Sequence, residues 1–510
     1  MALNFLFIYP DFWEIQKRVH SVGGSYQEGI ASISAVLKED GHNVSLYQIT
    51  YMPAKEEFLS KIAGYNPDMI GVTIRSVSLE SVIEMTGWLD DKFPDIPIIA
   101  GGYHPTLAPD ETISFRGIDA ICIGEGEYPL RDMIRAYEKN GNRFDTQCES
   151  FWFKNEDGSI EKNPVRPFLR DLNELPFPDI DLFDIPNLKS NKDGQIADAI
   201  VSRGCLYACA YCSNAHLRKA YKDAKNYARY RSPENAIIYL ERILEKDPNI
   251  HYFAFGDAIL NMFDDWFYEF IDLYKTRIGL KYSCNLRFDL MDEKMCRVLA
   301  ETGCYYVTIG LESGNEEFRR KYLKRNISDE QILKVTKWLK SEGITVITYN
   351  IVGFPHETLA LSLETVKLNA RANADKIIIN IFQPYPSTEL RKISEDAGFI
   401  DANSRLDPTA VVPLRMPNFP KRDILYLFYA FGSLVKMYRK VYSITDAEKR
   451  ARKEAALDKR ITGAFYPRGL LRRIYQMRRW FITHAKQAVA NTAPSFYRKL
   501  RERKYKILNQ

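Results

Sequence analysis

Three cysteines lie close together near the middle of the chain, at Cys205, Cys209 and Cys212. Their spacing is C-x3-C-x2-C, and Tyr211 stands directly before the third cysteine. Three thiolates so placed can hold three irons of a cubic iron–sulfur cluster. The fourth iron would keep an open coordination position, which distinguishes a catalytic metal site from a structural one. The cysteines therefore favour a catalytic 4Fe–4S cluster.

A structural zinc site is the alternative, with His216 as a fourth ligand beside the three cysteines. Zinc sites usually consist of two short ligand pairs separated by a longer loop. Here all four candidates lie within twelve residues, and no second pair follows. Disulfides fit less well, because the N-terminus lacks the basic region of a secretory signal and reads as a buried strand.

The cysteine stretch resembles that of the radical S-adenosylmethionine (SAM) enzymes, whose signature is this spacing. The resemblance covers roughly residues 1–405. It implies one-electron reduction of the cluster by an external reductant such as flavodoxin or ferredoxin. It further implies reductive cleavage of SAM and hydrogen abstraction by a 5′-deoxyadenosyl radical.

The elements around the cysteines repeat in a regular order. Six repeats of strand then helix predict a partial parallel (β/α)6 barrel over residues 191–405, with its site at the carboxyl ends of the strands. The predicted strands are 199–202, 252–255, 281–285, 305–310, 345–351 and 377–382.

Polar residues follow each of these strands, and their chemistry suits SAM. An acidic group suits the amine or the ribose, and an arginine suits the carboxylate. By the resemblance, Asp257 is expected at the methionine amine, Glu312 at the ribose, and Arg320 or Lys321 at the carboxylate. The remaining SAM contacts are expected from Tyr211, Gly353, Pro355 and Gln383.

The first 148 residues also alternate between strands and helices. This rhythm predicts a doubly wound parallel sheet covered on both faces, with ligands at the carboxyl ends of its strands. Glycine-rich loops follow those ends, at 101–105 and 124–127. Glycine lets the backbone approach a ligand closely, although doubly wound domains without a ligand have such loops too.

Placed ahead of the cysteines, this region resembles the cobalamin-binding domain of cobalamin-dependent radical SAM enzymes. The loop that supplies a histidine to cobalt in other cobalamin proteins, Asp-x-His-x-x-Gly, is missing after the first strand. The resemblance implies cobalamin without a protein histidine on cobalt, and it leaves open a domain that binds nothing. The expected cobalamin contacts are Ser76, Gly101, Gly102, His104, Gly124, Glu125 and Gly126.

Residues 149–190 are predicted to be a connector, with a hairpin around 155–158 and a proline-rich stretch at 175–179. Residues 406–510 are predicted to be a helical, basic region. From residue 436 onwards the chain has 21 Lys and Arg against 5 Asp and Glu, a net of +16, so the rest carries 5 − 16 = −11.

The basic region has arginines interleaved with large apolar residues over 466–490. Such a helix can lie on an anionic membrane surface, bind nucleic acid, or pack on the barrel with a solvated basic face. Membrane contact would make a lipid substrate plausible, and nucleic acid is the least expected partner.

Bulk composition fits a soluble protein of several domains, since 45% of its 510 residues are hydrophobic. No run of eighteen apolar residues predicts a membrane-spanning helix. Eight cysteines, three of them in one motif, favour a reducing compartment. The protein is therefore expected in the cytoplasm, with peripheral membrane association left open.

These observations predict a radical SAM enzyme that, with cobalamin, methylates an unactivated carbon. One alternative is a related enzyme that catalyses cyclisation, rearrangement or oxidation without methyl transfer. Another is a zinc-stabilised nucleic-acid-binding protein. The sequence does not identify the substrate, which could be a small molecule or a lipid.

Overall fold

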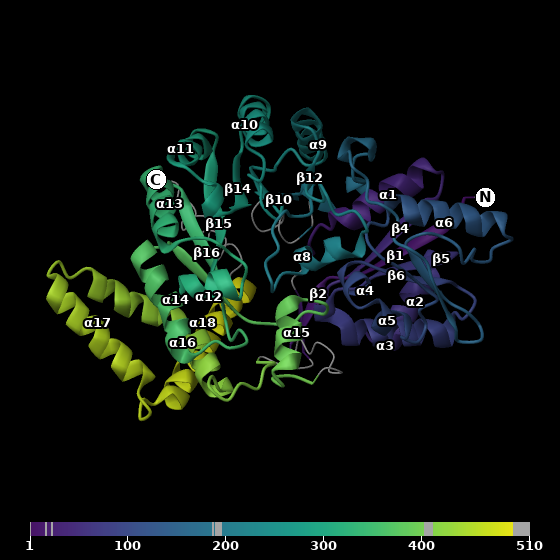
Figure 1. Ribbon diagram of the computed structural model, residues 1–510. Helices are drawn as coiled ribbons and strands as arrows, with labels where there is room; N and C mark the ends of the chain where they lie inside the picture. The colour runs from purple at the N-terminus through teal and green to yellow at the C-terminus, as the bar shows by residue number, and fades with distance from the viewer. Residues whose placement is uncertain are drawn as a thin grey trace.

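The computed structural model describes residues 2–15, 18–21, 24–185, 188, 196–401 and 412–492. They form two α/β units, each built on its own sheet, and a C-terminal group of helices. Figure 1 shows the first unit on the right, the second in the centre and the C-terminal helices at the lower left. This confirms the predicted fold class.

The first sheet has seven strands in the order β4-β1-β5-β6-β7-β8-β9. Its first five strands in this order are parallel, and the last two join antiparallel. The strands are β1 Asn4–Pro10, β4 Asn43–Ile49, β5 Met69–Thr73, β6 Ile98–Gly101, β7 Ala120–Cys122, β8 Phe151–Lys154 and β9 Ile160–Lys162.

Helices cover both faces of this sheet, as the alternating pattern predicts. One face packs against α1 (Glu28–Glu39) and α6 (Glu127–Lys139). The other packs against α2 (Lys55–Tyr65), α3 (Leu79–Lys92) and the short α5 (Pro109–Ile113). The predicted connector hairpin proves to be β8 and β9, so it extends the first sheet.

Two features of this unit were not expected from the sequence. The segment after β1 contains a small hairpin, β2 (Phe12–Ile15) and β3 (Arg18–Ser21). The glycine loop after β6 continues into a short helix, α4 (Tyr103–Leu107). Both are too short to leave a periodic pattern in the sequence.

The second sheet has six parallel strands in the order β10-β13-β14-β15-β16-β17. Chain order equals sheet order, which is the arrangement of an open barrel. The strands are β10 Ile196–Ala199, β13 Tyr252–Phe255, β14 Lys281–Leu286, β15 Cys304–Glu312, β16 Thr345–Val352 and β17 Lys376–Ile381.

Helices surround this sheet on its outer side, as Figure 1 shows. They are α9 Pro233–Lys246, α10 Asp264–Leu273, α11 Glu293–Glu301, α12 Glu316–Lys321, α13 Asp329–Ser341 and α14 Leu359–Ala372, with the short α8 Ser213–Leu217 and α15 Glu389–Asp396 at the strand ends. The first barrel strand was predicted at 199–202, which is three residues late. Ser202 instead begins β11 (Ser202–Arg203), which pairs antiparallel with β12 (Arg229–Tyr230).

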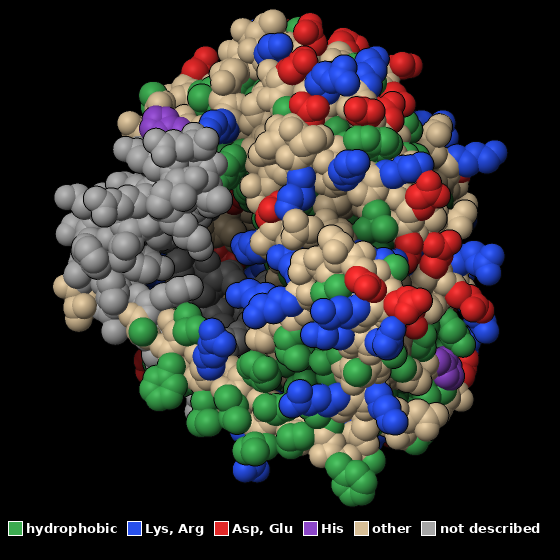
Figure 2. All heavy atoms as spheres, turned by 90° about the vertical axis from the view of Figure 1, so that its left-hand side faces the viewer, with side chains coloured by type: hydrophobic (Ala, Val, Ile, Leu, Met, Phe, Trp, Pro, Cys, Tyr) green, Lys and Arg blue, Asp and Glu red, His purple; other side chains and the backbone are tan. Residues whose placement is uncertain are grey.

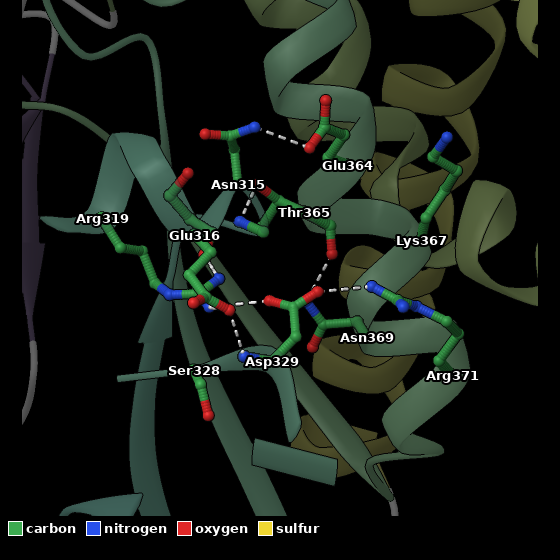
Figure 3. A network of polar contacts seen from close by, with 12 residues as sticks. Asn315, Glu316, Arg319, Ser328, Asp329, Glu364, Thr365, Lys367, Asn369 and Arg371 are labelled. Atoms are coloured by element: carbon green, nitrogen blue, oxygen red, sulfur yellow. Dashed lines mark hydrogen bonds and ion pairs between the residues drawn. The ribbon is translucent and has the colours of Figure 1, made fainter. Parts of the chain in front are cut away.

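A polar network ties α12, α13 and α14 together behind the strand ends (Figure 3). Asp329 accepts hydrogen bonds from Arg319 on one side and Arg371 on the other, each at 2.7 Å. The Arg319 side chain is fully buried and also donates to the carbonyls of Ser313 and Ile327. The network therefore fixes both ends of the segment that follows β15.

The C-terminal helices are α16 (Lys421–Tyr442), α17 (Ala447–Thr462) and α18 (Arg468–Thr492). They lie in the region that was predicted to be helical, and α18 corresponds to the helix expected over 466–490. α16 buries an apolar face in a core shared with β16, α14 and the cysteine loop. Among the described helices, none is long and apolar enough to cross a membrane.

Candidate active site

The three cysteines lie on the loop between β11 and α8, at the carboxyl end of the second sheet. Cys205 and Cys209 are buried and Cys212 is partly exposed. Main-chain hydrogen bonds hold the loop at its centre. The Ala210 amide donates to the carbonyl of Leu323 at 3.2 Å, and the Leu390 amide donates to the carbonyl of Ala210 at 3.1 Å. The loop is thus clamped between the segments that follow β15 and β17.

The donor set fits a cluster better than a zinc ion. His216 is engaged at both ring nitrogens, by the carbonyl of Cys212 at 3.0 Å and by the amide of Glu389 at 3.1 Å. Over the described residues, no three His, Cys, Asp or Glu side chains converge where one ion could sit. A zinc site needs such convergence. A cubic cluster does not, because each cysteine binds a different iron.

Two buried arginines face the cysteines. Arg287, just after β14, lies 3.8 Å from the Cys209 sulfur and stacks over the ring of Tyr207. Arg325 lies 3.7 Å from the same sulfur and donates to the Gly310 carbonyl at 2.7 Å. Two guanidinium groups beside a thiolate favour negative charge there, as a cluster with bound carboxylate requires.

Glu312 lies at the end of β15, where the pairing with β16 slips by one residue. Its φ is +65°, a left-handed conformation that is uncommon for residues other than glycine. Burial raises the pKa of its carboxyl, while Arg325 and a hydrogen bond from Tyr211 act in the opposite direction. The bulge thus aims Glu312 at the side of the cysteine loop, where the sequence predicted a ribose contact.

Asp257 follows β13 and is fully buried. One carboxylate oxygen, Oδ1, accepts hydrogen bonds from the Val201 amide at 3.0 Å and from the Ser202 hydroxyl. The other, Oδ2, has no hydrogen-bond partner among the described residues. Burial raises the pKa of this carboxyl to about 6. Oδ1 therefore holds Val201 and Ser202 in place ahead of the cysteine loop. Oδ2 remains available to accept a hydrogen bond from a ligand.

The loops after β16 and β17 complete the edge. The Glu357 carboxylate accepts the amides of Gly353 and Phe354, which closes the first loop into a tight turn. The Phe354 ring lies 5.8 Å from that of Tyr211. Gly353 and Pro355 are buried, and Gln383 keeps a buried side-chain oxygen without a partner in the described part of the chain. These predicted residues therefore lie on the same edge as the cysteines.

Arg320 is the exception among the predicted SAM contacts. It is exposed on α12, and so is its neighbour Lys321. The segment that follows α12 is the part of the chain that approaches Cys209. The buried cation beside that cysteine is therefore Arg325. Helical geometry explains the difference, since α12 buries Phe318 and Arg319 and turns the next two side chains to solvent.

A cavity of about 360 Å³ lies between the two sheets. This volume is in the range of small-molecule sites. The first unit contributes its glycine loops, and the second contributes residues around the cysteine loop. The lining includes Gly101, Gly102, Tyr103, Gly124, Glu125 and Gly126 from the first unit, with Ser202, Arg203, Asn214 and Asp257 from the second.

Glycine is required at two positions in this cavity. Gly102 has φ +103°, and Gly124 has φ +89°; a Cβ on Gly124 would also stand 2.5 Å from the Tyr221 hydroxyl oxygen. A Cβ on Gly101 would meet no atom within 4 Å, so it would project into the open space. The loops thus offer bare backbone to a ligand, which suits close packing of a large cofactor.

Ser76 and His104 lie elsewhere. They are buried and share a hydrogen bond of 3.0 Å, and the His104 imidazole lies 3.6 Å from the Glu111 carboxylate. Neither residue is part of the cavity lining that the structure describes, and their cobalamin contact stays a prediction. None of the described lining residues is a histidine.

Buried ion pairs join the two units beside the cavity. Arg203, two residues before the first cysteine, lies 2.5 Å from Glu127 and 3.7 Å from Glu125. Arg229 also pairs with Glu125. Glu28 adds a third carboxyl group. Burial raises the pKa of this group to about 7. These contacts connect the glycine loop after β7 directly to the strand that leads into the cysteines.

Sequence reasoning overlooked three of these residues: Arg203, Arg325 and Tyr103. Arg203 directly precedes the cysteine motif, which is a signal that could have been used. Arg325 carries no such signal, because α12 separates it from β15. Tyr103 stood within the noted glycine loop, but only the structure turns it into the cavity.

Two family models match the chain. The radical SAM superfamily matches residues 199–368 and the B12 binding domain matches residues 19–134. The matches lie within the second and first α/β units respectively, and they imply a 4Fe–4S cluster, SAM and cobalamin as cofactors. The cysteine loop, the two arginines and the glycine-lined cavity fit these groups.

Several curated proteins are similar to this chain. An uncharacterized methyltransferase of Pyrococcus horikoshii is 24% identical, over 76% of this chain and 82% of its own length. The anaerobic magnesium-protoporphyrin IX monomethyl ester cyclase of Rubrivivax gelatinosus is 25% identical, over 76% of this chain and 69% of its own.

Solved structures share the fold. The radical SAM methyltransferase TsrM from Kitasatospora setae, with cobalamin and a 4Fe–4S cluster bound, aligns with a TM-score of 0.63 at 17% identity, over 82% of this chain and 80% of its own. The cobalamin-dependent radical SAM enzyme OxsB aligns with a TM-score of 0.65 at 16% identity, over 99% of this chain and 75% of its own. The chain therefore combines a radical SAM domain, over residues 199–368, with a B12-binding domain, over residues 19–134.

Proposed function

We propose that the protein is a cobalamin-dependent radical SAM methyltransferase that methylates an unactivated carbon of a small-molecule or lipid substrate. The observation that carries this proposal is the cavity between the two units. It extends from the glycine loops of the first sheet to Asp257 and Asn214 beside the cysteine loop. Groups held by the two units would therefore face one common space.

When bound, the cluster with SAM supplies radical chemistry, and cobalamin supplies a transferable methyl group. The chain's own part is to bind and orient these groups. Arg287 and Arg325 place two positive charges where a carboxylate would lie beside Cys209. Asp257 offers a free oxygen to an amine, and Glu312 offers a carboxylate to ribose hydroxyls. Because these side chains are buried, they also keep bulk water from the reacting groups.

Two of the similar proteins carry methyltransferase in their names, which supports methyl transfer. A third is a cyclase, which supports the second candidate, radical chemistry without methyl transfer. The two candidates predict the same binding edge and differ in their products. Methyl transfer forms S-adenosylhomocysteine together with 5′-deoxyadenosine, whereas cyclisation or oxidation forms 5′-deoxyadenosine alone.

Anaerobic purification followed by metal, cobalamin and product analysis tests the proposal. We expect about four irons and one cobalamin per chain, and both SAM products on addition of a one-electron reductant and substrate-containing cell extract. A protein that holds iron but no cobalamin would contradict it. Formation of 5′-deoxyadenosine without S-adenosylhomocysteine in a reaction that consumes substrate would favour the second candidate. Comparing metabolites and lipids of a deletion strain with its parent would identify the substrate class.

A further inference from the structure

The C-terminal helix α18 has two apolar faces, and only one of them is packed. Leu471 and Tyr475 lie against the core that α16 shares with the barrel. Beside them, Arg468 is buried and donates to Asp423 of α16 at 2.9 Å. These contacts pack α18 against the rest of the protein.

The second face is exposed to solvent. Its large apolar residues recur at intervals of four, three and four positions, which places them along one side of the helix. Their side chains are 45–64% exposed. Trp480 is exposed next to this row, and its ring meets that of Phe481 edge to face at 5.0 Å. The exposed row is Leu470, Ile474, Met477 and Phe481.

A basic groove lies at the start of this row, between α18 and the first turn of α16. Its volume is about 480 Å³, and four of its seven lining residues are cationic: Lys421, Arg422, Arg472 and Arg473. Arg422 pairs with Asp423, but within the described part of the chain no carboxylate pairs with the other three. The Arg472 Nε is buried without a hydrogen-bond partner among the described residues.

Figure 2 shows the side of the molecule on which these helices lie. Hydrophobic side chains gather along its lower edge, and Lys and Arg side chains lie above and among them. Phe465, which precedes α18, is fully exposed. Soluble monomers rarely leave a continuous apolar face of this kind in water unless another surface covers it.

The chemistry of the face identifies the surface that covers it. Aliphatic side chains in a row bury well in hydrocarbon, tryptophan favours the level of lipid headgroups, and arginines beside them attract anionic phosphates. Nucleic acid would use the cations but would leave Leu470, Ile474 and Met477 in water. We infer that α18 docks the protein on an anionic phospholipid surface, with its exposed row in the outer acyl region and the basic groove on headgroup phosphates.

This inference is independent of the proposed function, because none of the described residues of α18 lines the cavity between the two units. If it holds, the enzyme works beside a membrane, and its substrate is one that can be reached there. Its failure would leave the proposed reaction unchanged.

Vesicle sedimentation of the full chain, purified anaerobically, tests the inference. We expect binding to vesicles of phosphatidylcholine with phosphatidylglycerol, and weak binding to phosphatidylcholine alone. The variant Ile474→Glu with Phe481→Glu should lower the partition constant at least about tenfold, because each change places a charge at the acyl boundary. The variant Arg472→Glu with Arg473→Glu should abolish the preference for the anionic lipid.

Matched controls separate docking from general charge or folding effects. Arg452→Glu with Lys453→Glu makes the same charge change on exposed positions of α17, and Ile160→Glu makes the same apolar-to-acidic change on β9. Both should bind like the unaltered protein, and iron content and circular dichroism should be the same in all variants. Equal loss in the α17 control, or no loss in the α18 variants, would overturn the inference. So would binding of duplex RNA, but not of vesicles, through Arg472 and Arg473.

Discussion

The two α/β units bind at the same place, the carboxyl edge of a parallel sheet, with different means. The glycine loops at the edge of the first sheet expose bare backbone to the cavity, since Gly101, Gly102 and Gly124 carry no side chain. The edge of the second sheet is lined by buried charges, with Arg287, Arg325 and Glu312 around the cysteines. The first edge therefore leaves space for a ligand, and the second edge surrounds a ligand with charged side chains.

This difference follows from the groups that each edge must hold. A large, rigid cofactor is held by the shape of a cavity, and any added side chain competes with it for space. A small zwitterion is held by opposite charges in fixed positions, which are strong only where water is excluded. The comparison predicts that the second edge is sensitive to charge and the first to volume. Four substitutions test this, in order of decreasing effect.

Cys209→Ala should remove the cluster altogether, because two cysteines cannot hold it. Iron should fall from about four per chain to below about one, while cobalamin content stays unchanged. The matched control is Cys148→Ala, since Cys148 is a free cysteine outside the loop. Anaerobic iron analysis and visible absorption measure the effect. Loss of cobalamin along with iron would show that the two edges are not separable.

Arg325→Met should weaken SAM binding roughly tenfold or more, and it should destabilise the fold by about 1–3 kcal/mol because the part-buried Gly310 carbonyl loses its donor. Arg320→Met is the control, since Arg320 is exposed on the preceding helix. It should change stability by less than about 0.5 kcal/mol. Calorimetry with SAM and urea unfolding measure the two effects. Equal effects of both substitutions would contradict the placement of the carboxylate contact at Arg325.

Glu357→Gln should flatten the pH dependence of stability. Burial raises the Glu357 pKa from its ordinary 4.5 to about 7, so the folded chain binds its proton more tightly than the unfolded chain. The stability from this proton is complete below pH 4.5 and is lost as the pH rises through 7. The loss is at most about 3 kcal/mol and disappears in the variant.

Urea unfolding at several pH values between 4.5 and 8 measures this slope. Asp257 and Glu28 contribute in the same direction, so the difference between the variant and the unaltered protein is the quantity to compare. Glu317→Gln, on the exposed side of α12, should leave the slope as it is. An unchanged slope in Glu357→Gln would show that this carboxyl is ionised in the folded protein.

Gly124→Ala should lower cobalamin retention with little change in iron content. The added methyl group meets the Tyr221 hydroxyl, and the positive φ costs about 1–2 kcal/mol for any side chain. Gly141→Ala isolates the second contribution, because Gly141 has φ +66° but open space around it. Cobalamin absorbance after gel filtration measures retention. Equal retention in both variants would mean that volume at the first edge is unimportant.

Much of this architecture could be predicted because the second sheet and the first five strands of the first sheet are parallel, with helices between successive strands. Strands such as 4–10 and 69–73 are buried along almost their whole length, so they read as short apolar runs between helices with clear ends. The same alternation places polar residues at strand ends, and Asp257, Glu312, Gly353 and Gln383 all lie on the expected edge. The cysteine motif was identified from its spacing in the sequence alone.

The remaining features depend on contacts between distant segments. Arg325 reaches Cys209 only because the network around Asp329 fixes the chain after α12. The hairpin of β8 and β9 looked like a linker because two short strands carry no sign of the sheet they join. The buried hydrogen bond of His104 to Ser76 likewise joins segments 28 residues apart, and no pattern in the sequence indicates it.

The two main-chain hydrogen bonds of Ala210 bear on when the cluster can be inserted during protein synthesis. The cysteine loop is held by Leu323 and by Leu390, and the second of these leaves the ribosome about 180 residues after Cys212, roughly 10–40 seconds later at ordinary rates of translation. Until then the three thiols lie on an unclamped loop, accessible to oxidants and to stray metal ions. Cluster insertion should therefore follow completion of the barrel, and cells grown with air should accumulate chains whose thiols were oxidised before the clamp closed.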